Sequence, residues 1–93
     1  MKKFEKGNSI YFECTYRNYD GAITEPQNPT YKIEDSKGNE EQTGTPQKKE
    51  DGVYYFYWTS SIADTYRVIF TGTIGGQAGV ARQVFKVVET QIT

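Results

Sequence analysis

The stretch Gly52-Val53-Tyr54-Tyr55-Phe56-Tyr57-Trp58-Thr59 decides the fold, because it holds an uninterrupted run of aromatic residues in a chain of 93 residues. Aromatic and β-branched side chains favour a pleated, half-buried surface, so we interpret this stretch as a central β-strand. Side chains alternate between the two faces of a strand. Because Trp58 offers the largest apolar area, we expect it to face the core together with Tyr54 and Phe56. The opposite face is then expected to carry Val53, Tyr55 and Tyr57.

Alternating apolar and polar residues indicate further strands on both sides of this central strand. Before it, strands are predicted over residues 2–5 and 9–17, around Tyr31 and Ile33, and over residues 39–43. After it, strands are predicted over residues 65–73 and 80–89. The residues expected to face inward on the second and sixth of these seven strands are Ile10, Phe12, Cys14, Tyr16, Tyr66, Val68 and Phe70. The last strand places Ala81, Phe85 and Val87 on one face.

Turn and loop signals separate the predicted strands. The segment Asp35-Ser36-Lys37-Gly38 has Asp first and Gly fourth, as a type I turn prefers. Gly75-Gly76 can supply the positive φ angles that a tight hairpin needs. Residues 18–29 contain two prolines as well as Asn, Asp and Gly, so we expect a long surface loop there. The run Lys48-Lys49-Glu50-Asp51 is predicted to be a solvated loop, and the polar strand over residues 39–43 fits the edge of a sheet.

These elements predict an all-β chain that forms one domain over residues 1–93. We find no segment with the period of a helix. Seven short strands separated by turns favour a two-sheet, seven-stranded antiparallel β-sandwich. A small open barrel is the alternative.

Several of the strand motifs resemble those of a known family. The pattern Gly52-x-Tyr54-x-x-x-Trp58-Thr59, followed by Asp64-Thr65-Tyr66-Arg67-Val68, is similar to the penultimate strands of bacterial and macroglobulin-type immunoglobulin-like domains. The resemblance implies an immunoglobulin-like sandwich in which Tyr66 is the tyrosine-corner residue, whose hydroxyl bonds a backbone group upstream. Cys14 and Val68 stand where antibody domains carry their cysteine pair, which implies the disulfide-free branch. Ser60 replaces the usual Pro and Asp64 the usual Gly of these domains.

Composition and charge narrow the range of partners. The formal net charge is −1, which argues against a surface that tracks nucleic-acid phosphates. No apolar run approaches the ~20 residues needed to cross a bilayer. The first six residues have no apolar stretch after their charges, so we expect a protein made in the cytoplasm without a signal peptide.

The chain offers little for catalysis, cofactor binding or metal binding. It contains no histidine and a single cysteine, Cys14, so a nucleophile would have no histidine base to activate it. The glycine-rich residues 72–79 lack the Lys-Ser/Thr and the helix of a phosphate loop. Carboxylates at Glu34-Asp35 and Glu40-Glu41 could bind calcium through oxygen, but their spacing matches no calcium loop and a solvated edge explains them equally. We therefore predict no enzyme, no cofactor and no metal.

Tyrosines are the candidate functional residues. Tyr11, Tyr55 and Tyr57 are expected to point away from the core, where rigid amphipathic rings favour an interface. Cover by a loop, or ordinary cross-strand pairing, would explain them as well. We predict partner binding by Tyr11, Tyr55, Tyr57 and Tyr19.

The function expected from these residues is that of a non-catalytic structural or binding module that docks on protein subunits. An accessory (decoration) protein of a viral or phage particle fits this description, and so does a self-assembling filament subunit. Its partners would be copies of itself or a capsid or surface protein, so an oligomeric or assembly-bound state is expected. The alternative is a carbohydrate- or cell-surface-binding module from a larger secreted protein, because exposed tyrosines can stack on sugar rings.

Overall fold

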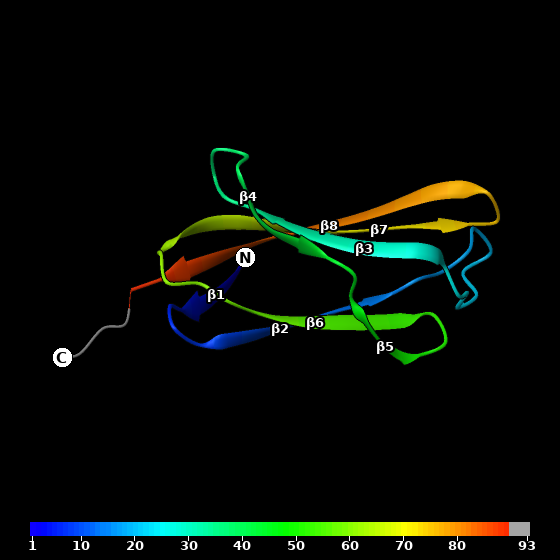
Figure 1. Cartoon of the computed structure of the whole chain (residues 1–93), viewed down its shortest axis with the longest axis horizontal. Coiled ribbons are helices and arrows are strands. Elements are labelled where there is room, and N and C mark those ends of the chain that lie inside the picture. The colour runs from blue at the N-terminus through cyan, green and yellow to red at the C-terminus, as the bar shows by residue number, and fades with distance from the viewer. Residues whose placement is uncertain (90–93) are drawn as a thin grey trace.

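A computed structural model describes residues 1–89, which form two packed layers of strands (Figure 1). None of these residues belongs to a helix able to cross a membrane. The strands are β1 (Lys2–Glu5), β2 (Ser9–Thr15), β3 (Gln27–Glu34), β4 (Glu40–Gly44), β5 (Gln47–Glu50), β6 (Val53–Thr59), β7 (Asp64–Ile74) and β8 (Gln77–Val88). The predicted all-β, two-sheet architecture is confirmed, but the predicted number of seven strands is wrong, since the described residues form eight.

The aromatic stretch forms the middle of one of the two sheets. That sheet has three strands in the order β2-β6-β5, and the other has five in the order β1-β8-β7-β3-β4. Tyr54, Phe56 and Trp58 of β6 are buried, as the alternation predicts. Val53, which we expected on the opposite face, is also buried. The polar strand β4 lies at the edge of the five-stranded sheet, as its composition predicts.

The additional strand, β5, falls where the sequence predicts a solvated loop. All four of its residues are exposed, so no apolar alternation marks them as a strand. β5 forms because its backbone pairs antiparallel with β6, which places Gln47 opposite Tyr55. The expectation of a loop at Lys48-Lys49-Glu50-Asp51 is therefore wrong for the first three of these residues.

The first strand breaks the antiparallel pattern that the sequence predicts. β1 pairs in parallel with β8, in a register that places Lys2 beside Phe85 and Glu5 beside Val88. The backbone N–H of Lys6 continues this contact by donating to the Val88 carbonyl oxygen at 2.9 Å. Phe4 packs against the core from this strand. A short strand with one aromatic residue carries no signal of its direction, which explains the wrong prediction.

The loop predicted over residues 18–29 ends earlier than expected, because β3 begins at Gln27. The pairing of β3 with β7 shifts register between Gln27 and Thr30. Asn28 adopts a positive φ of 51° at this irregularity. Such a bulge lets Pro29 sit within a strand, because a bulged residue needs no ladder hydrogen bond.

The two sheets enclose an aromatic core centred on Phe85, whose side chain is 1% exposed. Its ring centroid lies 5.0 Å from Phe12, 5.7 Å from Tyr66, 5.9 Å from Trp58 and 6.0 Å from Phe4. Phe12 and Trp58 belong to the three-stranded sheet, and Phe4 and Tyr66 belong to the five-stranded sheet, so Phe85 joins the two layers. Ile69 has the opposite parity to Val68 and Phe70 and is nevertheless buried. Lys32 and Arg82 lie directly across from it on the two neighbouring strands, and the aliphatic stems of such residues cover apolar surface.

Two turns and one corner fix the strand connections. Gly75 and Gly76 join β7 to β8 with φ angles of 58° and 79°, which confirms the predicted tight hairpin. The Gly38 N–H donates to the Asp35 carbonyl oxygen at 3.0 Å in the predicted turn between β3 and β4. Between β6 and β7, the buried Tyr66 donates its hydroxyl hydrogen to the Ile62 carbonyl oxygen at 2.7 Å.

Candidate functional site

Tyr11, Tyr55 and Tyr57 come together on the outer face of the three-stranded sheet. Tyr11 of β2 lies directly opposite Tyr57 of β6, and Tyr55 lies one step further along the same face. The ring centroid of Tyr11 is 5.3 Å from that of Tyr57 and 5.6 Å from that of Tyr55. The rings of Tyr55 and Tyr57 are 6.1 Å apart in an edge-to-face arrangement. We call these three residues the tyrosine cluster.

The tyrosine cluster is open to solvent. Tyr57 is 57% exposed and Tyr11 is 44% exposed, while Tyr55 is half-buried between its neighbours. These exposed fractions mean that no loop of the described residues covers the rings of Tyr11 and Tyr57. Contiguous exposed tyrosines differ from the scattered apolar residues of an ordinary surface, because together they offer a single amphipathic patch.

Polar side chains hold the rings of the tyrosine cluster in place. Tyr11 donates its hydroxyl hydrogen to Glu13 Oε1 at 2.6 Å, and the same oxygen is 3.0 Å from Lys49 Nζ. Tyr55 donates to Gln47 Oε1 at 3.1 Å. These exposed contacts add little to stability, but they orient the rings before any partner arrives.

The same contacts shift the pKa values of Tyr11, Glu13 and Lys49. The hydrogen bond from Tyr11, followed by that from Lys49, lowers the pKa of the Glu13 carboxyl. The same bond to Glu13 raises the pKa of the Tyr11 hydroxyl, and the carboxylate raises the pKa of Lys49. At neutral pH Glu13 is therefore ionised, Lys49 keeps its positive charge and Tyr11 keeps its hydroxyl hydrogen.

Tyr19, the fourth predicted residue, lies apart from the tyrosine cluster. It is 98% exposed on the loop that follows β2. Asn18 holds this loop, since its Oδ1 accepts hydrogen bonds from the N–H groups of Asp20 and Ala22, both at 3.0 Å. Among residues 1–89, none of the close aromatic pairs includes Tyr19. The structure thus assembles three of the four predicted residues into one surface.

Glu25 anchors the far end of the loop that carries Tyr19. Its carboxylate accepts a hydrogen bond from the Gly52 N–H at 2.8 Å and another from the Tyr54 hydroxyl, and it lies 3.5 Å from Lys48 Nζ. The hydrogen bond from Tyr54 is the main cause of a lowered pKa of the Glu25 carboxyl, followed by that from the Gly52 backbone. The loop is therefore fastened to the start of β6 through an ionised side chain.

This anchor predicts acid sensitivity. A carboxyl whose pKa is lower in the folded state stabilises the fold above its unfolded pKa, and that contribution is lost as the pH falls through the folded pKa. The pKa values of the Glu13, Asp35 and Asp64 carboxyls are lowered as well. We therefore expect the midpoint temperature of unfolding to fall as the pH drops below about 4.5. Thermal unfolding followed between about pH 3 and pH 7 measures this dependence.

The Glu25→Gln variant isolates the contribution of the anchor, because it keeps the shape of the side chain and removes its charge. We expect its unfolding midpoint to depend less on pH below about 4.5 than that of the unmodified protein. Asp20→Asn removes an exposed carboxylate from the same loop and is the control. An acid profile of Glu25→Gln that matches the Asp20→Asn profile would contradict the assignment.

The other groups considered for chemistry have structural roles in this fold. Cys14 is half-buried, and desolvation raises the pKa of its thiol, which disfavours the reactive thiolate. In the β3–β4 hairpin, Asp35 Oδ1 accepts hydrogen bonds from the N–H groups of Lys37 and Asn39, both at 2.9 Å. Glu34 lies 3.2 Å from Lys32 Nζ. Within residues 1–89, no three His, Cys, Asp or Glu side chains are grouped as a metal site would require.

Sequence reasoning missed the part of this site that β5 contributes. Gln47 reaches Tyr55, and Lys49 reaches Glu13 beside Tyr11, only because β5 pairs with β6. The sequence offers only a weak indication of β5. A polar run precedes the aromatic strand, and a strand at the edge of a sheet can be polar.

Comparisons of the chain with protein-family models, with curated proteins and with solved structures found no match.

Proposed function

We propose that this chain is a non-catalytic binding module that docks on protein subunits through the tyrosine cluster. The observation that carries the proposal is the contiguity of three tyrosine rings on one sheet face, two of them well exposed and two with hydroxyls held by neighbouring side chains. Tyrosine rings bury a large area at low entropic cost and are enriched among residues that dominate binding energy. A pre-ordered patch also avoids the cost of fixing side chains on binding.

The finer fold assignment that we propose is an immunoglobulin-like sandwich with one additional strand. In that fold, the third, sixth and seventh strands form one sheet, and the first, second, fifth and fourth strands form the other. The neighbours β3, β7 and β8 in one sheet, with β2, β6 and β5 in the other, support this arrangement. The bond from Tyr66 to the Ile62 carbonyl, four residues upstream, supports a tyrosine corner.

Within this class, we propose two contexts in which the tyrosine cluster would meet a protein subunit. One is an accessory (decoration) protein of a viral or phage particle, where the partner is a capsid or surface protein. The other is a filament subunit, where the partner is a second copy of the chain. Sedimentation velocity over a range of concentrations separates them, because only the filament subunit grows in mass by itself.

Substitution of the tyrosine cluster tests the proposal directly. Tyr11→Ser combined with Tyr57→Ser is expected to weaken binding to the partner, or self-association, by at least about 30-fold, the effect of losing a central binding residue. Tyr19→Ser is the matched control, because it removes an exposed ring of the same chemistry outside the cluster. Binding is measured by affinity capture on immobilised protein followed by titration of the captured subunit.

The outcome that contradicts the proposal is equally specific. If the Tyr11→Ser, Tyr57→Ser protein captures and binds the same subunit as strongly as the Tyr19→Ser protein does, the tyrosine cluster is not the interface. Circular dichroism of each variant tests whether the sandwich is intact.

A carbohydrate-binding role is the second candidate, favoured by one observation. The stacked rings of Tyr11 and Tyr55 lie beside two side-chain oxygens, from Glu13 and Gln47, which accept their hydroxyl hydrogens. Flat rings next to hydrogen-bonding groups suit a sugar ring, which has apolar faces and hydroxyl edges. A glycan array probed with the unmodified and the Tyr11→Ser, Tyr57→Ser proteins distinguishes this candidate, since only sugar binding gives spots that disappear with the double substitution.

A further inference from the structure

The inner face of β8 changes from exposed to buried along the strand. Phe85 and Val87 are each 1% exposed. Ala81 and Gln83 have the same parity, so their side chains point to the same face, yet both are exposed. The inner face of β8 is therefore covered at Phe85 and Val87 and open to solvent at Ala81 and Gln83.

The change coincides with the point where β1 begins. β1 pairs with β8 only from Phe85 to Val88. Along residues 77–84, β8 pairs with β7 on one side and with no described strand on the other. Those residues therefore present a free edge whose backbone N–H and C=O groups are available to an added strand.

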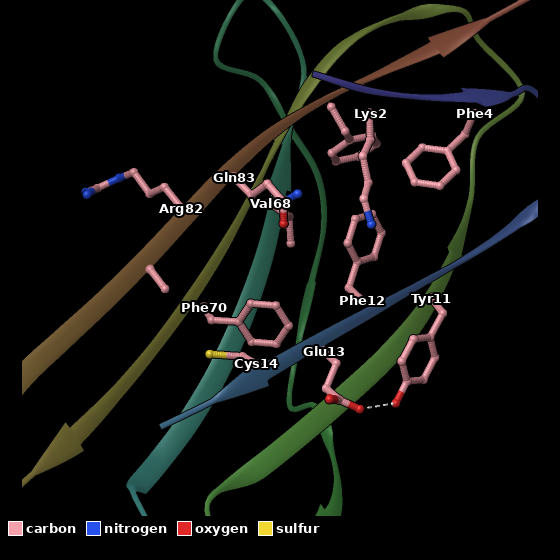
Figure 2. Close-up of a pocket in the computed structure, with 12 residues that line it drawn as sticks. Lys2, Phe4, Tyr11, Phe12, Glu13, Cys14, Val68, Phe70, Arg82 and Gln83 are labelled. Atoms are coloured by element: carbon pink, nitrogen blue, oxygen red, sulfur yellow. Dashed lines mark hydrogen bonds between the residues drawn. The ribbon is translucent and has the colours of Figure 1, made fainter. Parts of the chain in front are cut away.

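A groove runs beside this free edge, between the two sheets. Its volume is about 320 Å³, which is within the range of ligand-binding pockets. Figure 2 shows Phe12 and Phe70 in this groove, with Cys14 next to Phe70 and with Gln83 on the β8 side. The groove thus has apolar side chains, Phe12, Val68 and Phe70, within a partly polar lining and is bordered by strand backbone, which suits an extended segment.

The charges around this edge are positive. Figure 2 shows the Lys2 side chain extending over Phe12, whereas Arg82 points away from the groove on the outer face. Lys3 and Lys86 lie side by side in the β1–β8 register. None of these four cations forms a salt bridge with a described residue. On the opposite rim, Glu13 is already engaged by Lys49 and Tyr11.

We propose that the free edge of β8 over residues 77–84 binds an extended acidic segment of another protein, which adds to the sheet as a strand in line with β1. Apolar side chains of the segment fill the groove over Phe12 and Phe70. Its carboxylates, on the opposite face of the added strand, lie near Arg82, Lys3 and Lys86. Pairing with the β8 edge of a second copy is disfavoured, because it brings two sets of these cations together. Tyr11 and Glu13 line the far rim of this groove, whereas Tyr55 and Tyr57 of the tyrosine cluster do not.

Synthetic peptides test the proposal. The probe is a fluorescently labelled heptapeptide in which aspartate alternates with valine, titrated with the full chain and followed by fluorescence polarisation. We expect it to bind at least tenfold more tightly than the same peptide with lysine in place of aspartate. Methylation of alternate backbone nitrogens in the probe is expected to weaken binding at least tenfold, because strand addition depends on those N–H groups. Bound peptide is also expected to slow the modification of Cys14 by a thiol reagent.

Two changes in the protein locate the site. Arg82→Glu is expected to weaken binding of the aspartate peptide at least tenfold and to strengthen binding of the lysine peptide. Lys37→Glu, in the β3–β4 turn, is the control for net charge. A six-residue alternating valine–aspartate extension before Lys2 would continue β1 along β8. It is expected to abolish binding of the free peptide and to protect Cys14.

Three results would overturn the proposal: equal affinity for the two peptides, binding unaffected by backbone methylation, or an unchanged rate of Cys14 modification at saturating peptide. A dimer that the six-residue extension converts to monomer would also overturn it, because a second copy would then occupy the edge. Tyr57→Ser, at a residue of the tyrosine cluster that does not line the groove, should leave peptide binding within about twofold, so failure at one surface is distinguishable from failure at the other.

Discussion

Replacing Phe85 with alanine is expected to destabilise the protein by about 3–5 kcal/mol, the usual cost of deleting a buried phenylalanine ring. Phe85 is 1% exposed and contacts aromatic rings from β1, β2, β6 and β7. Its removal therefore leaves a cavity that several rings line and that none can fill without moving. A small domain has only about 5–15 kcal/mol of stability in total, so the loss is a large part of it.

The neighbouring position provides the control for this prediction. Val84→Ala removes an apolar side chain from the same strand, but Val84 is 44% exposed on the outer face. We expect it to change stability by no more than about 0.5 kcal/mol. Urea unfolding followed by the fluorescence of the buried Trp58 compares the two variants. Equal destabilisation would show that the core does not centre on Phe85.

Replacing Gly52 with alanine is expected to cost about 3 kcal/mol, from two causes that add. Gly52 has a φ of 79°, which L residues other than glycine adopt only with strain. A Cβ at this position would also lie 2.5 Å from Ile23 Cγ2 and 3.1 Å from the Thr24 carbonyl oxygen. The displacement would disturb the hydrogen bond from the Gly52 N–H to Glu25, so both the loop and the start of β6 are affected.

Gly38→Ala separates these two causes. Gly38 has a φ of 84°, close to that of Gly52, but an added Cβ there meets no atom within 4 Å. Only the backbone strain remains, and we expect a cost of about 1 kcal/mol. Urea unfolding of both variants gives the comparison. If the two substitutions cost the same, the close packing of Ile23 on Gly52 contributes nothing.

The parts of the fold that the sequence predicts correctly are encoded by neighbouring residues. The buried face of β6 follows from alternation within the strand itself, and the β7–β8 hairpin follows from Gly75-Gly76. β5 and the direction of β1 could not be predicted in the same way, because both depend on pairing with strands distant in sequence. Their own residues are polar or too few to show a pattern.

The candidate site, like the fold, is only partly predictable from the sequence. Alternation alone places Tyr11 on an outer face and Tyr57 on an outer face, but only the β2–β6 register places them opposite each other. The polar contacts of Gln47 and Lys49 depend on β5, a strand that the sequence does not predict. Val53, although on the predicted outer parity, is buried, because alternation reports the direction of a side chain and not what else covers it.

The pairing of β1 with β8 has a consequence for the order of folding. Lys2 lies beside Phe85, so the first described strand takes its partner from the last. On the ribosome, β1 emerges before β8 and stays without this neighbour until β8 has been made. Contacts between such distant segments form slowly, since a long loop must close before they bring any gain. Closure of the sandwich over Phe85 is therefore a late event, in which nascent chains that stop before β8 cannot take part.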